Sequence, residues 1–300
     1  MSGYEASTSK PLVERQEDEP MLDLLRAMFV VHGRARRLSA ARLAVTVVVA
    51  GSGAIATVDP RVAPAVTTAG AIWATLYSLG LASWASRQAV RGATIQEMFD
   101  RKLYGFQWNK AIADEPIGHE DINGLAAKYR GAADMIKGYY EVPLLPQPYD
   151  VAACQLQNLG WGSRVRRRYA RLIVILLTAW AIAGLSVGVA MNLTVFELLL
   201  RWYIPALGAL LLGLDTYRSQ QDVVRERERA IRLLRDAIEK KLDGEQLRGA
   251  LDRIQDVIFL TRRHHVRVPE IFFKAFRSSD RADFNSAVSE LAARVERVTS

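Results

Sequence analysis

The chain has 300 residues, half of them apolar, and a formal net charge of +8. In a soluble protein this balance would suggest nucleic-acid binding, but here most of the excess arginine stands beside long apolar stretches, where topology and anionic lipid heads account for it. The single cysteine, Cys154, excludes a disulfide framework and a cysteine-rich zinc site and fits a reducing compartment.

The first forty residues precede any long apolar stretch. Residues 1–20 are polar, rich in Ser, Glu and Lys and without an apolar period, so we predict a disordered tail. In Met21–Val31 the apolar residues recur at helical spacing, which predicts a cytoplasmic helix over residues 21–41.

Four apolar stretches follow, arranged as two pairs. They are Leu43–Val58, Val62–Ser86, Leu172–Phe196 and, roughly, Leu193–Leu214. The second and third contain no charged residue over more than the ~20 residues that a helix needs to cross a hydrocarbon core about 30 Å thick. Since a bilayer admits exposed backbone only in helices or closed barrels, we predict two transmembrane hairpins, residues 42–86 and 170–214.

Arginine and lysine residues define the orientation of these hairpins. Clusters stand before the first and third stretches and after the second and fourth, whereas the hairpin tips are nearly free of positive charge. The clusters are Arg34, Arg36, Arg37 and Arg42; Arg87, Arg91, Arg101 and Lys102; Arg164, Arg166, Arg167, Arg168 and Arg171; and Arg218, Arg225, Arg227 and Arg229. Because positive charge stays on the cytoplasmic side, both termini and the middle segment are predicted to be cytoplasmic.

The middle segment, residues 87–169, is predicted to be helical. Apolar residues at helical spacing predict one helix around Phe99, another from Asp121 to about Tyr140, and a third over Val151–Leu159. Prolines after Tyr140 are expected to end the second helix.

The C-terminal segment, residues 215–300, is also predicted to be helical. An amphipathic helix continues from the fourth apolar stretch to about Leu242, and further helices cover Glu245–Leu260 and Asp283–Val298. With no convincing strand, the predicted fold class is an all-α membrane protein, with four transmembrane helices as two hairpins and a helical cytoplasmic module.

Small residues line one face of the second apolar stretch. They are Thr68, Ala71, Thr75, Ser78 and Ala82. Such a seam lets helices approach closely in lipid, and a pore wall would also use small polar residues, so the seam is either a packing face or a pore lining. In the third stretch, Gly184 and Gly188 form a Gly-x-x-x-Gly pattern, which likewise indicates helix packing.

Glu197 and Arg201 are ionisable residues inside an apolar stretch, and intramembrane charge marks a candidate functional site. Their i, i+4 spacing allows them to pair on one helix face. They form either an ion pair at the outer interface or the charged mouth of a pore.

No catalytic or metal-binding pattern accompanies these features. The sequence has no P-loop, zincin helix or nucleophile elbow, and the adjacent His264 and His265 lack the spacing of a chelating pair. We therefore expect no enzyme activity, no metal and no cofactor. The basic stretch Arg262–Arg267 is either a solvated face or a ligand site, because guanidinium groups suit phosphates and nearby aromatic rings can stack on bases.

Three segments together resemble the signature of a known family. They are Ile95–Asp100 (IQEMFD) with Leu103–Asn109 (LYGFQWN); Cys154–Trp161 (CQLQNLGW) with Arg166–Tyr169 (RRRY); and Arg262–Arg263 with Val268–Phe273 (VPEIFF) and Arg277. In this order around two hairpins, they resemble the S-4TM family, the four-transmembrane effectors associated with SMODS-type nucleotidyltransferases. The structural motif residues are Phe99, Asp100, Trp108, Asn109, Asn158 and Trp161. The chain departs from the family pattern at Phe106–Gln107, Gly162 and Phe273.

This resemblance implies a function. Members are predicted effectors of CBASS-like anti-phage signalling: a nucleotidyltransferase makes a cyclic nucleotide on infection, and the effector binds it and permeabilises the inner membrane. The resemblance implies a multi-pass protein of the bacterial inner membrane, a cyclic nucleotide ligand, a homo-oligomer, and a nucleotidyltransferase that acts through its product rather than by contact. The implied nucleotide-binding residues are Arg262, Arg263, Arg267 and Arg277 for phosphates and Phe272 or Phe273 for a base. Trp108 and Trp161 are expected to join the cytoplasmic helices.

A function of a different class also fits these features. A constitutive membrane scaffold or sensor would use the same spans and recruit a protein partner through its cytoplasmic helices. Leakage of vesicles triggered by a cyclic nucleotide separates the two functions.

Overall fold

The structure is a computed structural model that describes residues 10–76, 79–80, 82–160, 163–240, 242–263, 268–269, 272, 275, 288–289 and 291–293. Every regular element in these ranges is a helix. The predicted all-α class is therefore confirmed for the part of the chain that the structure describes.

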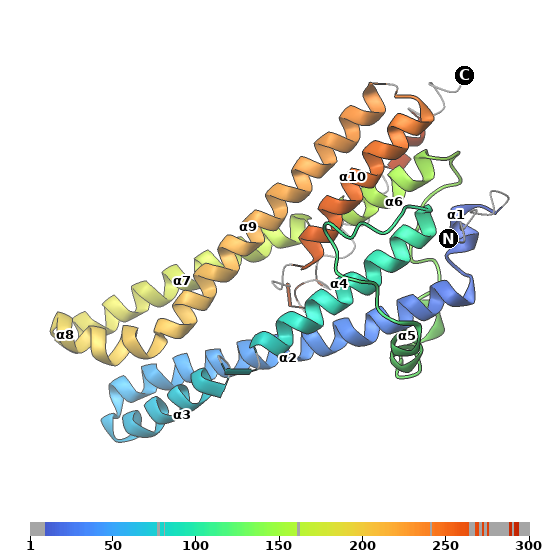
Figure 1. The fold of residues 1–300 in the computed structure, drawn as a ribbon. Coiled ribbons are helices and arrows are strands. Elements are labelled where there is room, and N and C mark those ends of the chain that lie inside the picture. The colour runs from blue at the N-terminus through green and yellow to red at the C-terminus, as the bar shows by residue number, and fades with distance from the viewer. Residues whose placement is uncertain are drawn as a thin grey trace.

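The first half of the chain is built on one long helix. After the short α1 (Leu12–Arg15), α2 runs from Glu19 to Val58 without a break, so the predicted cytoplasmic helix and first apolar stretch are one element. A 3₁₀ turn (Pro60–Val62) then leads into α3 (Ala63–Leu76). Both α3 and α4 (Ala82–Tyr104) pack back against α2 (Figure 1).

The second half forms another hairpin. After α5 (His119–Ala126), a 3₁₀ turn (Ala133–Met135) and α6 (Tyr149–Gly160), the chain enters α7 (Ser163–Ala190). It turns at Asn192, whose φ of 52° is one that asparagine tolerates. It returns through α8 (Val195–Leu198), a π-helical segment (Leu199–Tyr203) and α9 (Ile204–Glu239), and α10 (Gly244–Arg263) then packs on α9.

The helices divide into two hairpins and a helical module (Figure 1). The hairpins are the C-terminal half of α2 with α3, and α7 with α8 and the first half of α9. The helical module consists of α1, the first half of α2, α4, α5, α6, the second half of α9 and α10. Its core contains Leu25, Phe99, Leu103, Tyr104 and Leu251, all fully buried or nearly so.

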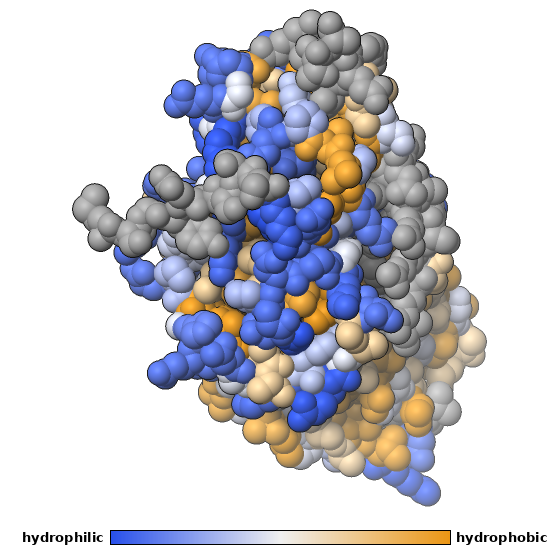
Figure 2. Space-filling model, turned by 90° about the vertical axis from the view of Figure 1, so that its right-hand side faces the viewer, coloured by the Kyte–Doolittle hydropathy of each residue, from blue (hydrophilic) through white to orange (hydrophobic). Residues whose placement is uncertain are grey.

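The hairpins leave their apolar side chains exposed. Among the described residues, every exposed large apolar side chain lies in or beside them except Met135, Leu144, Leu233 and Leu260. Val189, for example, is 79% exposed. On the face of the module seen in Figure 2, hydrophilic residues dominate the coloured surface, and apolar residues gather toward its lower edge. Apolar surface of this extent needs a cover of lipid or protein.

Helix length and composition identify fewer candidate membrane spans than the four that the sequence predicts. Among the described residues, one helical stretch, Tyr149–Ala190, is long and apolar enough to cross a membrane. A second qualifies if Val195–Tyr203 and Ala206–Glu239, which meet at 69°, count as one span. The four-span topology therefore stays a prediction.

Two predicted segments differ from the structure. Within the predicted disordered tail, residues 10–20 are ordered, because Leu12 is buried and the side chain of Gln16 both donates to and accepts from the backbone of Tyr140. Residues 1–9 lie outside the described residues. The helix predicted from Asp121 to Tyr140 ends at Ala126. It could not reach Tyr140, because Gly138 has a φ of 58°, which lies outside the helical region.

In the second hairpin, α7 approaches the segment before α9 closely at Gly184. A Cβ atom at Gly184 would lie 2.5 Å from Nε1 of Trp202, whose ring stacks on Trp180 at 4.7 Å. The neighbouring Tyr203 donates its hydroxyl to the carbonyl of Ala181 at 2.8 Å. The aromatic rings therefore fill the space beside Gly184 and have little room to move.

Gly184→Ala is expected to lower the free energy of unfolding by about 1–3 kcal/mol, because the added methyl overpacks this contact. The control is Gly208→Ala on α9, where an added Cβ meets no atom within 4 Å. Since alanine favours helix, the control should keep or slightly raise stability. Thermal unfolding of the full chain in detergent measures both, and equal stability of the two variants would contradict the packing described.

Candidate functional site

Charged side chains lie inside the helical module, between α4 and α10. Glu97 and Asp100 on α4 are completely buried, Arg101 is 3% exposed, and the side chain of Arg262 at the end of α10 is 8% exposed. Buried charges are tolerated only when they are paired and hydrogen-bonded. We call Glu97, Asp100, Arg101, Gln255 and Arg262 the buried charge network.

Arg262 faces the two carboxylates of α4. Its Nη1 lies 2.6 Å from Oδ2 of Asp100 and 3.7 Å from Oε2 of Glu97. Gln255, also completely buried, donates from Nε2 to Glu97 at 2.8 Å and to Asp100 at 3.1 Å. About two turns of α10, from Gln255 to Arg262, are thereby held against α4 by the ion pairs of Arg262 and the hydrogen bonds of Gln255.

Arg101 makes the reverse connection from α4 to α10. Its Nε donates to Glu97 at 2.6 Å, while its two terminal nitrogens reach Asp252 at 2.9 Å and Asp256 at 2.5 Å. Asn109, in the loop after α4, donates to Asp256 at 3.0 Å. The two helices are thus joined by arginines from both sides.

Tyr140 extends the network to α6. Its hydroxyl donates to Oδ1 of Asp100 at 2.6 Å and accepts from Nδ2 of Asn158 at 2.5 Å. The ring of Phe99 packs beside the rings of Tyr139 and Tyr140. Asp100, Asn158 and Arg262 come from the three signature segments, and the structure brings them to one place.

The burial and the balance of charge in the network affect the pKa of Glu97. Four carboxylates (Glu97, Asp100, Asp252 and Asp256) contact two guanidinium groups, so negative charge is in excess. Burial, with a contribution from Asp100, raises the pKa of Glu97 to about 7, although Arg262, Arg101 and Gln255 oppose the shift. Glu97 therefore titrates near neutral pH.

Two arginines that the sequence assigned to topology also approach the network. Burial lowers the pKa of Arg227 on α9 well below its usual value, and the positive charges of Arg166 and Arg262 lower it further. Arg166 on α7 donates to Gln220 at 2.8 Å, and burial lowers its pKa to about 10. Their positions in the arginine clusters before the third and after the fourth apolar stretch concealed this role in the sequence.

The predicted nucleotide-binding residues have different surroundings. Arg262 is occupied by Asp100 and Glu97, as described above. Arg263 donates to the carbonyl of Ile112 at 3.1 Å and lies over the ring of Phe259. Phe272 packs on Tyr169 with ring centroids 5.4 Å apart. Arg267, Phe273 and Arg277 lie outside the described residues.

The tryptophan and asparagine of the first signature segment hold the loop after α4. Trp108 donates from Nε1 to the carbonyl of Asp114 at 3.0 Å and packs in a small apolar cluster with Phe259. Asn109 accepts from the backbone of Ala111 as it donates to Asp256. Trp161 lies outside the described residues.

The predicted seam residues on α3 are exposed where they are described. Thr68 and Thr75 donate their hydroxyls to the carbonyls of Pro64 and Ala71, four residues earlier. Ser78 and the side chain of Ala82 lie outside the description. On α7, Gly188 faces Leu198, whose Cδ2 would be 3.0 Å from an added Cβ.

Glu197 and Arg201 pair in the second hairpin, as their spacing allows. Nη2 of Arg201 donates to Oε1 of Glu197 at 3.1 Å. The other oxygen of Glu197 accepts from the backbone and the hydroxyl of Thr194, forming a capping box at the start of α8. The carboxylate thus serves both the ion pair and the helix start.

Comparison with known proteins gives one consistent result. A family model described as the SMODS-associating 4TM effector domain matches residues 10–291. A probable CBASS effector molecule of Bacillus cereus strain VD146 is 24% identical over 274 residues, which cover 86% of this chain and 90% of that protein. No solved structure matches the chain. The similarity extends over the helical module and both hairpins.

Asp100→Asn is expected to lower the free energy of unfolding by about 3–5 kcal/mol, because it leaves the buried Arg262 without its nearest counter-charge. Asp222→Asn is the control, since Asp222 pairs with Arg225 on the exposed surface of α9 and should lose less than about 1 kcal/mol. Chemical unfolding of the full chain in detergent measures both. Similar small losses would show that the network does not hold α10 on α4.

Glu97→Gln is expected to change how stability depends on pH. Between about pH 4.5 and 7 the folded protein retains a proton on Glu97 that the unfolded chain has released, so the free energy of unfolding falls as pH rises through this window. The variant should show a shallower fall, whereas Glu226→Gln, on the exposed surface of α9, should keep the wild-type slope. Unchanged slopes in both variants would be the opposing result.

Proposed function

Because the chain belongs to the SMODS-associating 4TM effector family, we propose that it is a membrane effector of CBASS anti-phage defence. The relative in Bacillus cereus, itself named a probable CBASS effector molecule, supports this assignment. The protein acts at the bacterial inner membrane, where a cyclic (oligo)nucleotide made during infection activates it. The activated form oligomerises or opens and makes the membrane permeable.

The proposed membrane topology has four spans, with both termini and the helical module in the cytoplasm. The exposed apolar side chains of both hairpins support it, since lipid is the cover that suits them. The arginine clusters at the inner ends of the hairpins agree with cytoplasmic placement of the module. The hairpins also contact each other, because α2 touches both α9 and the segment Leu199–Tyr203.

The observation that carries the proposal is that the buried charge network joins α4 to α10 in the helical module. α4 continues from the first hairpin, and α10 follows α9, which continues from the second. A change in the contacts of Asp100 and Arg262 therefore changes how the two hairpins are held together. This arrangement suits an effector whose membrane part responds to an event in its cytoplasmic part.

A ligand activates such a protein only if it binds the active arrangement more tightly than the resting one. The phosphate contacts predicted for Arg262, Arg263, Arg267 and Arg277, and the base contact of Phe272 or Phe273, stay a prediction. For Arg262 such a contact requires the phosphate to replace Asp100 as its counter-charge. That exchange would release the end of α10 from α4.

The direct test uses the purified full chain in vesicles of bacterial lipid that enclose a fluorescent dye. Cyclic di- and trinucleotides are added one at a time, with the corresponding linear nucleotides and protein-free vesicles as controls. We expect dye leakage with at least one cyclic nucleotide and none with the controls. No leakage with any cyclic nucleotide, together with a stable protein partner of the module, would favour the scaffold instead.

A further inference from the structure

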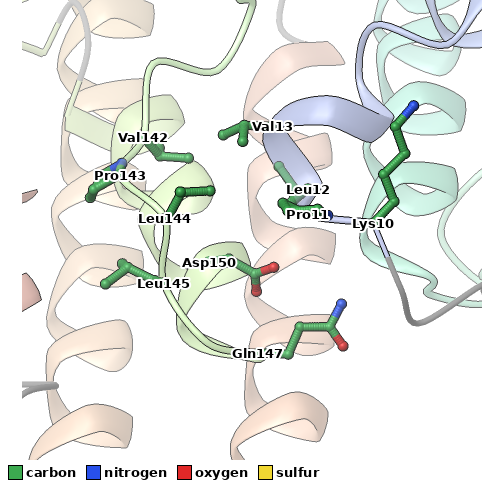
Figure 3. A pocket seen from close by; sticks show the side chains of 10 residues that line it. All are labelled: Lys10, Pro11, Leu12, Val13, Val142, Pro143, Leu144, Leu145, Gln147 and Asp150. Carbon is green, nitrogen blue, oxygen red and sulfur yellow. The ribbon is translucent and has the colours of Figure 1, made fainter.

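The helical module has on its surface an open cavity of about 400 Å³. Residues 10–13, before and within α1, line one side, and residues 142–145 with Gln147 line the other (Figure 3). Pocket volumes of roughly 300–1,000 Å³, lined mainly by apolar groups with a few polar ones, are typical of small-molecule sites. None of the residues predicted to bind nucleotide lines this cavity.

Asp150 supplies a carboxylate to this mostly apolar space. It stands in the first turn of α6, is 6% exposed, and points with Gln147 toward the N-terminal segment (Figure 3). Oδ1 accepts from the backbone N–H of Val151 at 2.7 Å. Burial raises the pKa of Asp150, against the attraction of Arg15 and Arg248. A nearly buried carboxylate can only accept hydrogen bonds when ionised, so the cavity favours a ligand that donates them.

Positive charge lies beside the cavity as well as within its wall. Lys10 is part of the lining, but its side chain extends away from Asp150 (Figure 3) and its ammonium pairs with Asp18 at 2.7 Å. Arg15 and Arg248 act on Asp150, and Nε and Nη2 of Arg15 are buried without a hydrogen-bond partner. A ligand with a flat donor-bearing ring and an anionic group matches apolar walls, an acceptor and adjacent cations together.

We propose that this cavity binds the guanine base of a nucleotide, with the adjacent N–H donors of the base on Asp150 and the phosphate of the nucleotide toward Arg15. Bases are commonly recognised by hydrogen bonds to this edge and by contact of their faces with apolar side chains. The inference rests on the proposed effector function, but it places the activating nucleotide at this cavity and not at the basic segment that ends α10. Arg248 precedes Arg263 on α10 by about 22 Å of helix, so the cavity and the basic segment cannot hold the same base.

The cavity is connected to the buried charge network. Gln16, just after α1, pairs with the backbone of Tyr140, whose hydroxyl donates to Asp100. Asp150 itself begins α6, which carries Asn158 to the same tyrosine hydroxyl. A base that pulls α1 and α6 together would therefore act on the contact of Asp100 with Arg262.

The test measures binding of cyclic di-GMP, cyclic di-AMP and cyclic di-UMP to the full chain in lipid nanodiscs. Wild-type protein should bind cyclic di-GMP at least about tenfold more tightly than the other two, because guanine alone offers two adjacent donors to one carboxylate. Asp150→Asn should remove this preference. Leu144→Trp, on the exposed loop, should weaken binding by filling the cavity while leaving Asp150 in place.

Two further variants, Glu120→Gln and Arg263→Ala, complete the design. Glu120→Gln is the matched control, an exposed acid in the first turn of α5, and should bind like wild type. Thermal unfolding of each variant shows that it is folded. Equal binding by wild type, Asp150→Asn and Leu144→Trp would overturn the inference, as would loss of binding in Arg263→Ala alone.

Leakage measured on the same variants separates this inference from the proposed function. Nucleotide-triggered leakage that is unchanged in Asp150→Asn and Leu144→Trp overturns the cavity as the site and leaves the effector function standing. Binding that depends on Asp150 without leakage supports the site and contradicts membrane permeabilisation.

Discussion

The exposed apolar side chains of α2, α3, α7 and α9 require a cover of lipid or of another apolar surface, and the rest of the structure depends on this constraint. These helices place large apolar side chains on their outer faces and keep the packed core in the helical module. Because α2 and α9 run without a break from the apolar part into the module, the two parts cannot be arranged independently. The polar contacts of the module therefore influence how the hairpins stand beside each other.

The buried charge network supplies the polar contacts of the module that join a helix continuing from one hairpin to a helix that follows the other. Apolar residues in the same space could hold α4 against α10 at least as tightly, since buried ion pairs contribute little net stability. Charged residues make the contact between the helices depend on other groups. The buried charge of Arg262 requires the carboxylate of Asp100, and the charge of Glu97 changes near neutral pH. A contact of this kind is stable until a competing charge or a change in packing reaches it, which agrees with the activation by a ligand proposed above.

Periodicity and charge placement predicted much of the fold from the sequence. Apolar spacing predicted α6, the long helix that leaves the fourth stretch, and α10, because each forms from residues close in sequence. The pairing of Gln16 with Tyr140 could not be predicted, since it joins residues 124 positions apart. Arg262 looked like part of an exposed basic stretch for the same reason: its carboxylates belong to another helix. The cavity beside Asp150 arises only when α1 and the loop before α6 come together.

Accessibility of single cysteines tests the membrane arrangement most directly. The one native cysteine, Cys154, is completely buried, and burial raises the pKa of its thiol, so it should not react. Cysteines are placed at the exposed hairpin tips (Arg61, Met191) and in the module (Leu233), and intact cells are treated with a membrane-impermeant maleimide. The account predicts labelling at both tips from outside and at Leu233 only after the membrane is broken. Labelling of Leu233 in intact cells, or of neither tip, would contradict it.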